Sequence, residues 1–159
     1  MYPLKIQTAG GKNLGRAEYL IVERNTFHIP DEKEIIDHYQ IASSQAEKII
    51  LVGIGKESAL CLMLASRFQP GELILSPLSN GDTLSDFLSE VKRKSGFLFS
   101  VCVPVTVYLP GNLPENDAKS VRRLLRRTSS THKRIEFYDS LHTHRTFLTN
   151  LCQRRKTLA

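Results

Sequence analysis

The sequence predicts an α/β fold in three layers: a mostly parallel sheet with helices on both faces and antiparallel strands at its N-terminal edge. Three observations lead to this fold class. From residue 31 onward, helical and strand-like patterns alternate at short spacing, as in sheets built from strand–helix–strand units. The segment 49–53 is apolar without interruption, which is typical of a strand buried on both faces. A glycine-containing turn then joins this segment to an apolar helical pattern.

The N-terminal edge is predicted as a pair of strands. LKIQT and AEYLIVE flank the segment AGGKNLG, whose glycines and Asn13 suit a turn. Strands joined by so short a connection run antiparallel. A further short strand is predicted around residues 26–29.

The first helix is expected to begin at Pro30 and Asp31. Asp31 and Glu34 resemble a capping box, and apolar residues at helical spacing follow them. The remaining elements are, in chain order, a strand over 49–53, a helix over 56–68, a strand over 72–76, a helix capped by Asp82 or Thr83, a strand over 101–109, a helix over 116–128, a strand over 134–138 and a closing helix over 141–155.

Length and composition predict one globular domain spanning residues 1–159. The chain is 41% hydrophobic and 24% charged, as in ordinary soluble proteins. The start of the chain has no apolar signal segment, and the longest apolar run, residues 97–109, is too short to span a membrane. Three widely spaced cysteines without a CxxC pair favour a reducing compartment, namely Cys61, Cys102 and Cys152. We therefore expect a cytoplasmic protein without a transmembrane segment.

Positive charge is concentrated at the C-terminal end. Residues 118–159 hold 11 of the 22 Lys and Arg residues but only two of the 16 acidic residues. This end therefore carries a formal charge of +9, whereas residues 1–117 carry −3. A partner that recognises the charge of this protein is expected to bind the C-terminal end.

The turn after segment 49–53 has the features of a tight strand-to-helix connection. Gly53 and Gly55 permit a sharp turn, and the helix that starts at Lys56 offers free N–H groups to an anion. The turn is not a P-loop, because Gly55-Lys56 is followed by Glu57, and it lacks the third glycine of a dinucleotide fingerprint. The simplest interpretation is that both glycines serve the turn alone.

At this turn the chain resembles the C-terminal half of the α/β-hydrolase family. The elbow pattern of that family, small-x-nucleophile-x-small, falls on GIGKE at residues 53–57, so Gly55 occupies the nucleophile position. The segment GELILSPL is similar to the strand after the elbow helix. The resemblance covers residues 47–155.

The resemblance also implies positions for the other members of a catalytic triad. VPVTVYLPG followed by NLPEND resembles the strand and loop that bear the acid, which would be Glu115 or Asp117. RIEFYDSLHTHRTFL resembles the last strand and the histidine loop, with His142 the first choice for the histidine and His144 the second.

The elbow departs from the family in ways that bear on activity. A glycine cannot attack a carbonyl, Glu57 replaces a small residue, and no HGGG-like loop precedes the elbow. Ser58 in the helix or Ser76 at the end of the next strand would have to act as the nucleophile in an active enzyme. Both hydroxyls are more simply explained as polar groups at a helix terminus and a strand end.

No cofactor and no metal are expected. His142 and His144 lie one residue apart with Asp139 nearby, but no second pair of ligands stands at metal-binding spacing. The other histidines are scattered along the sequence.

The predicted helix over 116–128 carries two pairs of arginines at i,i+4 spacing, namely Arg122 with Arg126 and Arg123 with Arg127. Like charges at this spacing repel by about 0.2–0.5 kcal/mol per pair in an isolated helix. An acidic protein face, nucleic acid or an anionic membrane surface would relieve this repulsion. No aromatic residue is interleaved with the arginines, so stacking on single-stranded nucleic acid is not indicated. Glutamates from elsewhere in the fold are the alternative partners.

The sequence thus leads to three hypotheses. The preferred one is a noncatalytic α/β-hydrolase-like domain that binds an acidic protein partner, or assembles with itself, through its basic C-terminal face. The first alternative is a small serine hydrolase acting on an ester or thioester. The second is a nucleic-acid-associated protein that uses the arginine-rich helix.

Overall fold

The computed structural model describes residues 4–8, 17–23, 31–79, 82–93, 95–140 and 143–149. These residues form a six-stranded sheet whose strands follow one another in chain order. The strands β2 to β6 are parallel, and β1 pairs antiparallel with β2 at one edge. The strands are β1 (Leu4–Thr8), β2 (Ala17–Val22), β3 (Lys48–Ile54), β4 (Glu72–Ser76), β5 (Val105–Pro110) and β6 (Lys133–Tyr138).

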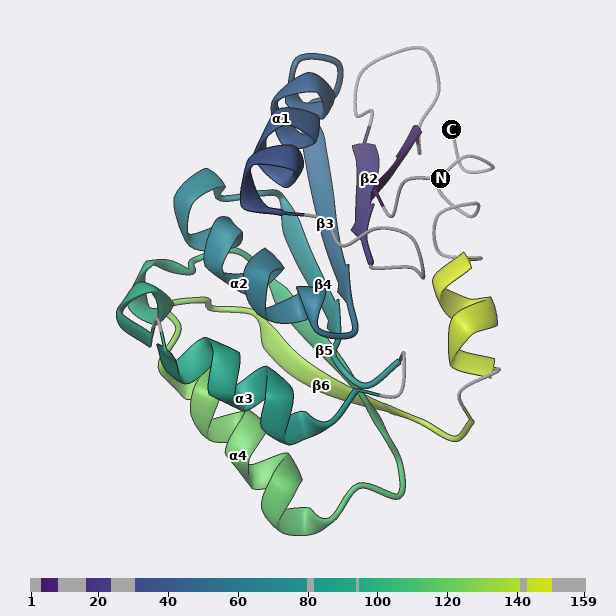
Figure 1. The fold of residues 1–159 in the computed structure, drawn as a ribbon, viewed down its shortest axis with the longest axis vertical. Coiled ribbons are helices and arrows are strands. Elements are labelled where there is room, and N and C mark those ends of the chain that lie inside the picture. Colours follow the sequence, from purple (N-terminus) through teal and green to yellow (C-terminus); the bar gives the residue numbers. More distant parts are fainter. Residues whose placement is uncertain are drawn as a thin grey trace.

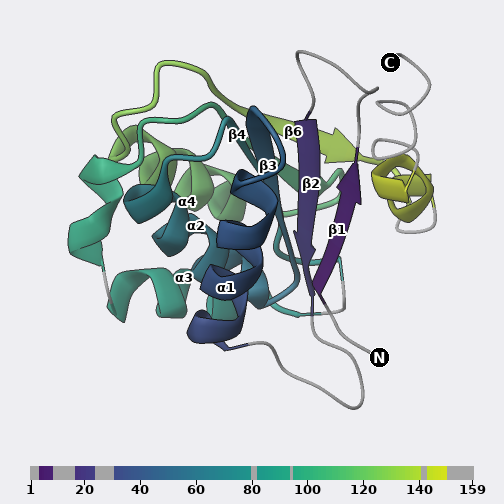
Figure 2. The same ribbon diagram turned by 90° about the horizontal axis from the view of Figure 1, so that it is seen from above.

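The helices form two unequal layers around this sheet. Four helices lie on one face, and a helix of residues 143–149, here called the closing helix, lies on the other (Figures 1 and 2). Each strand from β3 to β6 is added on the same side of its predecessor, so right-handed crossovers bring all four connecting helices to one face. These four are α1 (Glu32–Ser43), α2 (Glu57–Phe68), α3 (Leu84–Arg93) and α4 (Glu115–Arg126).

Two apolar cores fill the spaces between sheet and helices. In β3, Ile49 and Leu51 belong to the large core under α1 to α4, whereas Ile50 and Val52 belong to a smaller core on the opposite face. This alternation explains the uninterrupted apolar run in the sequence, because both faces of the strand are buried. Leu148 of the closing helix completes the smaller core.

Local capping signals in the sequence are confirmed. The Asp31 carboxylate accepts a hydrogen bond of 2.8 Å from the backbone N–H of Glu34 at the start of α1. At the start of α3, the hydroxyl of Thr83 accepts from the N–H of Asp86 at 3.1 Å. Thr83 rather than Asp82 is therefore the capping residue, and each bond satisfies a helix N–H that has no partner within its helix.

The strand predicted over 101–109 is wrong in its first half, because β5 begins only at Val105. Residues 95–100 form a 3-10 helix, and the following residues are not in a strand. Pro104 has no N–H to give to a sheet ladder. Val101 and Val103 are nevertheless buried, so their apolar character reflects the core under the helices and not strand pairing.

Other predictions fall partly on residues that are not described. The short strand around 26–29 lies outside the described residues, as does Cys152. The closing helix was predicted over 141–155, and its described part is 143–149. Within the described ranges, no helix is long and apolar enough to cross a membrane, and Cys61 and Cys102 are free thiols.

Candidate functional site

The connection between β3 and α2, called the elbow below, is a tight turn whose geometry requires both glycines. Gly55 has a φ of 67°, a left-handed conformation that glycine adopts without strain. A Cβ atom on Gly53 would lie 2.8 Å from the Cα of Ser58, so strand and helix approach each other too closely for any side chain. The apex residue, Gly55, carries no nucleophile.

The backbone N–H groups and the serine hydroxyl at this elbow form hydrogen bonds with other groups of the same chain. The backbone N–H of Gly55 donates to the carbonyl of Ser76 at 2.9 Å, and the N–H of Lys56 donates to the carboxylate of Asp82 at 2.9 Å. The hydroxyl of Ser58 is buried and donates to the carbonyl of Gly53 at 3.0 Å. The negative charge that a helix N-terminus attracts is thus supplied at Lys56 by Asp82.

The thiol nearest the elbow is also unsuited to nucleophilic chemistry. Cys61 of α2 is completely buried against the elbow. Burial, reinforced by the negative charge of Glu57, raises the pKa of the Cys61 thiol. Because the thiolate is the reactive form of cysteine, Cys61 serves packing.

The structure brings together one serine and one histidine. Ser76 ends β4, His144 lies in the closing helix, and the Oγ of Ser76 is 2.7 Å from the Nε2 of His144. Ser79 also hydrogen-bonds the hydroxyl of Ser76. The solvent-exposed fraction is 0% for Ser76 and 2% for His144, so this pair lies inside the protein.

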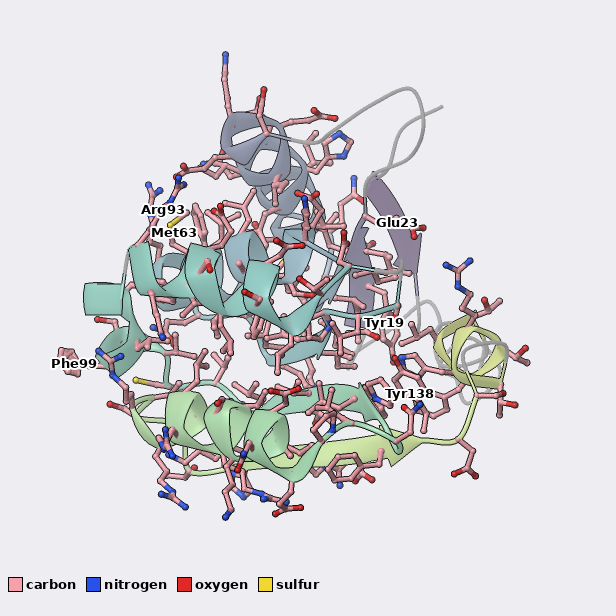
Figure 3. The ribbon with its side chains drawn as sticks, turned by 60° about the horizontal axis from the view of Figure 1, so that its bottom comes forward. Tyr19, Glu23, Met63, Arg93, Phe99 and Tyr138 are labelled. Atoms are coloured by element: carbon pink, nitrogen blue, oxygen red, sulfur yellow. The ribbon has the colours of Figure 1, made fainter. Side chains whose placement is uncertain are left out.

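Aromatic rings surround His144. Its imidazole stacks on the ring of Tyr138, with centroids 4.0 Å apart and an interplanar angle of 4°. The rings of Tyr108 and Phe147 lie 5.1 and 6.3 Å away, centroid to centroid. Figure 3 shows Tyr138 beside the closing helix. No sequence pattern indicates these two tyrosines, which lie on the consecutive strands β5 and β6 at positions that face the closing helix.

Burial decides the charge of this histidine. It lowers the pKa of His144 from 6.5 to about 4, because the charged imidazolium loses hydration inside the protein. Burial likewise raises the pKa of the Tyr138 hydroxyl, an effect partly offset by a hydrogen bond with the Ser79 side chain. His144 is therefore neutral at physiological pH, and a neutral imidazole beside a hydroxyl has two of the three parts of a catalytic triad.

The other residues predicted for a triad lie elsewhere. Glu115 and Asp117 are in the first turn of α4, and the carboxylate of Glu115 is 3.4 Å from the guanidinium of Arg122. His142 lies outside the described residues. The described side-chain contacts of His144 are the Ser76 hydroxyl and three aromatic rings, and none of them is a carboxylate.

A basic groove lies at the opposite edge of the sheet from β1, between α4 and β6. It encloses about 330 Å³, and we call it the α4–β6 groove. Its residues are Arg122, Leu125, Arg126, Lys133, Arg134, Ile135 and Phe137. Phe137 is 48% exposed, which is unusual for a large apolar side chain in this molecule. Cationic groups therefore surround an apolar surface that includes an exposed ring.

The cations of this region differ in how far the fold itself neutralises them. Arg122 pairs with Glu115 at 3.4 Å, and Arg134 pairs with Glu136 at 3.6 Å. The ammonium group of Lys133 donates to the carbonyls of Leu125 and Thr128 at 3.0 and 3.2 Å, at the C-terminal end of α4. Among the described residues, no carboxylate pairs with the remaining arginines of α4 and its C-cap, which are Arg123, Arg126 and Arg127.

A second depression of about 380 Å³ lies between α2 and α3. Its lining includes the acidic residues Glu57, Asp86 and Glu90 beside the apolar residues Leu60 and Phe97. Within the described part of the chain, no group of three or more His, Cys, Asp and Glu residues is arranged to hold a metal ion.

Comparison with known proteins supports the fold. No protein-family model matches the chain, and no curated protein matches it. One solved structure with a similar fold comes from work on LipS and LipT, two metagenome-derived lipolytic enzymes that increase the diversity of known lipase and esterase families. The two chains are 10% identical with a TM-score of 0.56, over 79% of this chain and 72% of that chain. At this identity the likeness shows an α/β-hydrolase-like fold, and it does not show which reaction, if any, the site supports.

Proposed function

We propose that this protein is a noncatalytic α/β-hydrolase-like domain that binds an acidic protein segment in the α4–β6 groove. The observation that carries the proposal is the composition of this groove, where Arg122, Arg126 and Lys133 surround the apolar side chains of Ile135 and Phe137. An acidic peptide that also carries apolar side chains complements both parts of such a surface.

The elbow supports the noncatalytic half of the proposal. A glycine at its apex offers no group that can attack a substrate carbonyl. The N–H of Gly55 is bonded to the carbonyl of Ser76, and the N–H of Lys56 to Asp82. These donors would have to be released before they could stabilise an oxyanion.

A protein partner fits the groove better than nucleic acid does. A phosphate backbone offers charge but no apolar side chain for the exposed ring of Phe137. Among the described residues that line the groove, Phe137 is the only aromatic one, so successive bases have no stacking platform there.

A small serine hydrolase is the second candidate, because the Ser76 Oγ and the His144 Nε2 are within hydrogen-bond distance at 2.7 Å. The fold likeness to lipolytic enzymes is compatible with it. Against it stand the burial of both side chains and the aromatic surroundings of the imidazole. Turnover of a generic ester that is lost on His144→Phe would decide for this candidate.

The proposal is tested by charge reversal inside and outside the groove. Arg126 lines the groove and Arg123 does not, although both are exposed on α4. Binding of an acidic peptide with interspersed leucines, followed by fluorescence anisotropy, should weaken about tenfold or more on Arg126→Glu. The same change of net charge in Arg123→Glu should weaken it by less than about threefold, because a charge outside the contact acts through screened solvent.

Other ligand classes give different results in the same assay. A duplex oligonucleotide that binds more tightly than the peptide, with an affinity that falls steeply with salt and equally in both variants, would favour the nucleic-acid alternative. Equal weakening of peptide binding by Arg126→Glu and Arg123→Glu would show that net charge, and not the groove, attracts the peptide.

A further inference from the structure

The outer edge of β6 lies directly beside the α4–β6 groove. The N–H of Val105 donates to the carbonyl of His132 at 2.8 Å, and the N–H of Gly111 donates to the carbonyl of Tyr138 at 2.8 Å. The ladder between β5 and β6 thus uses the backbone groups of residues 132, 134, 136 and 138. Because backbone groups alternate in direction along a strand, those of Lys133, Ile135 and Phe137 point away from β5.

Within the described part of the chain, β6 is the last strand of the sheet and nothing pairs with its outer edge. An open edge presents free N–H and C=O groups to any extended chain. Charged side chains, which commonly protect edges, stand on β6 at Lys133, Arg134 and Glu136, yet position 137 carries a phenylalanine that is 48% exposed. This edge therefore combines open backbone groups with an apolar contact.

The side chains of β6 alternate between the two faces of the sheet. Ile135 and Phe137 lie on the α4 side, where they line the groove, whereas Tyr138 stacks on His144 of the closing helix on the other side. A chain added at the edge of β6 would direct every second side chain into the groove. There it would meet the apolar surface of Phe137 and the guanidinium groups of α4.

We propose that the partner segment binds as an additional β-strand on β6, with acidic and apolar side chains in alternation entering the α4–β6 groove. This inference rests on the proposed function, because it specifies how the acidic segment is held. Main-chain hydrogen bonds to Lys133, Ile135 and Phe137 would supply affinity, and the groove would supply the preference for charge.

Charge complementarity distinguishes this occupant from a second copy of the chain. Pairing two β6 edges would bring Arg126 and the other cations of one groove close to those of the other. Like charges across a strand pair are destabilising, and no carboxylate of the described residues pairs with Arg126 to reduce the repulsion. An acidic strand from a different protein removes this repulsion.

The peptide side of the test uses backbone methylation. A peptide in which every second residue is alternately glutamate and valine, with threonine at the positions between them, is compared with two N-methylated forms, one methylated at its odd positions and the other at its even positions. In an added strand only one set of N–H groups faces β6. We therefore expect one form to lose about tenfold or more in affinity and the other to bind nearly as the parent peptide does.

The protein side compares Phe137→Pro with Phe137→Ala. Both variants remove the ring, but only proline removes the outward N–H, and proline is tolerated on an edge strand. Phe137→Pro should bind the peptide about fivefold more weakly than Phe137→Ala, which corresponds to one hydrogen bond. Equal thermal unfolding midpoints of the two variants would show that the strand is intact.

The outcomes separate this inference from the function on which it depends. If both methylated peptides bind like the parent while Arg126→Glu still abolishes binding, the groove binds acidic segments but not as a strand, and the inference is overturned. Binding that is lost equally with both methylated forms and that does not distinguish Phe137→Pro from Phe137→Ala also overturns it. If no acidic peptide binds at all, the proposed function fails as well.

Discussion

His144 has a polar partner that suits catalysis and surroundings that suit a core residue. Its Nε2 lies 2.7 Å from the Ser76 hydroxyl, yet only 2% of its surface is exposed and its ring stacks on Tyr138 at 4.0 Å. A buried imidazole needs a partner for its polar atoms, and Ser76 provides one. The hydrogen bond and the stacking together fix the closing helix against the carboxyl ends of β4 and β6.

This environment predicts a pH-dependent stability. The pKa of His144 falls from 6.5 to about 4 on folding, so between these values the unfolded chain binds a proton that the folded chain does not. Above pH 6.5 His144 is neutral in both states and its titration does not affect the free energy of unfolding. As pH falls toward 4, proton binding by the unfolded chain lowers the free energy of unfolding by roughly 2–3 kcal/mol. His144→Phe keeps an aromatic ring beside Tyr138 and removes this titration.

Denaturant unfolding of both proteins at several pH values measures the effect. The difference in free energy of unfolding between wild type and His144→Phe should change across pH 4 to 6.5 and stay constant above it. Parallel pH curves would contradict the neutral, buried state of His144. Other titrating groups are common to both proteins and cancel in the difference.

At the scale of elements, the sequence predicts those features that depend on residues close together in the chain. The bounds of β4 and the cap at Asp31 follow from apolar runs and side chain-to-backbone spacing, which act within a few residues. The contact between Ser76 and His144 joins residues 68 apart, and no local pattern chooses His144 over His142. The run 101–104 misled the prediction because burial in a loop and burial in a strand both favour valine.

The close approach of β3 and α2 yields a second prediction. A Cβ on Gly53 would lie 2.8 Å from the backbone Cα of Ser58 and 3.0 Å from the Cβ of Cys61, so Gly53→Ala must push the helix away from the strand. We expect a loss of about 2 kcal/mol or more in free energy of unfolding, as in other overpacked cores.

Gly96→Ala is the matched control for this prediction. A Cβ at Gly96 would meet no atom within 4 Å, so this variant should remain within about 0.5 kcal/mol of the wild type. Chemical denaturation gives both values. Equal stability of the two variants would mean that the elbow relaxes freely, and steric crowding would then not explain why position 53 is a glycine.

At the scale of the whole molecule, the asymmetry of the fold separates the Ser76–His144 pair from the α4–β6 groove. The sequential strand order puts α1 to α4 on one face and leaves the closing helix to cover the other (Figure 2). The buried Ser76–His144 pair joins the end of β4 to this closing helix, whereas the α4–β6 groove lies at the last strand. The residues that resemble an active site are thereby separated from the surface where we expect binding.

A substitution in the closing helix can test whether residues 1–159 unfold as one cooperative unit. Leu148 is 8% exposed and belongs to the core that contains Tyr19, Ile50 and Val52. Leu148→Ala should lower the free energy of unfolding by about 2–4 kcal/mol. Because the closing helix covers strands that also carry the larger core, the whole transition should shift without a separate early step.

Two spectroscopic signals report on the two faces in this experiment. Of the described tyrosines, Tyr19 and Tyr108 lie in or against the smaller core and Tyr138 stacks on His144, whereas Tyr39 lies in the larger core. Tyrosine fluorescence therefore follows mainly the closing-helix side, and far-UV ellipticity follows the helices of both faces. Coincident transitions in Leu148→Ala are expected for a single domain. Thr149→Ala is the control, since Thr149 is exposed and its hydroxyl donates only to the carbonyl of Arg145 in the same helix. A fluorescence transition that precedes the loss of ellipticity would show that the closing helix detaches from a core that stays folded, and the chain would then consist of two cooperative units.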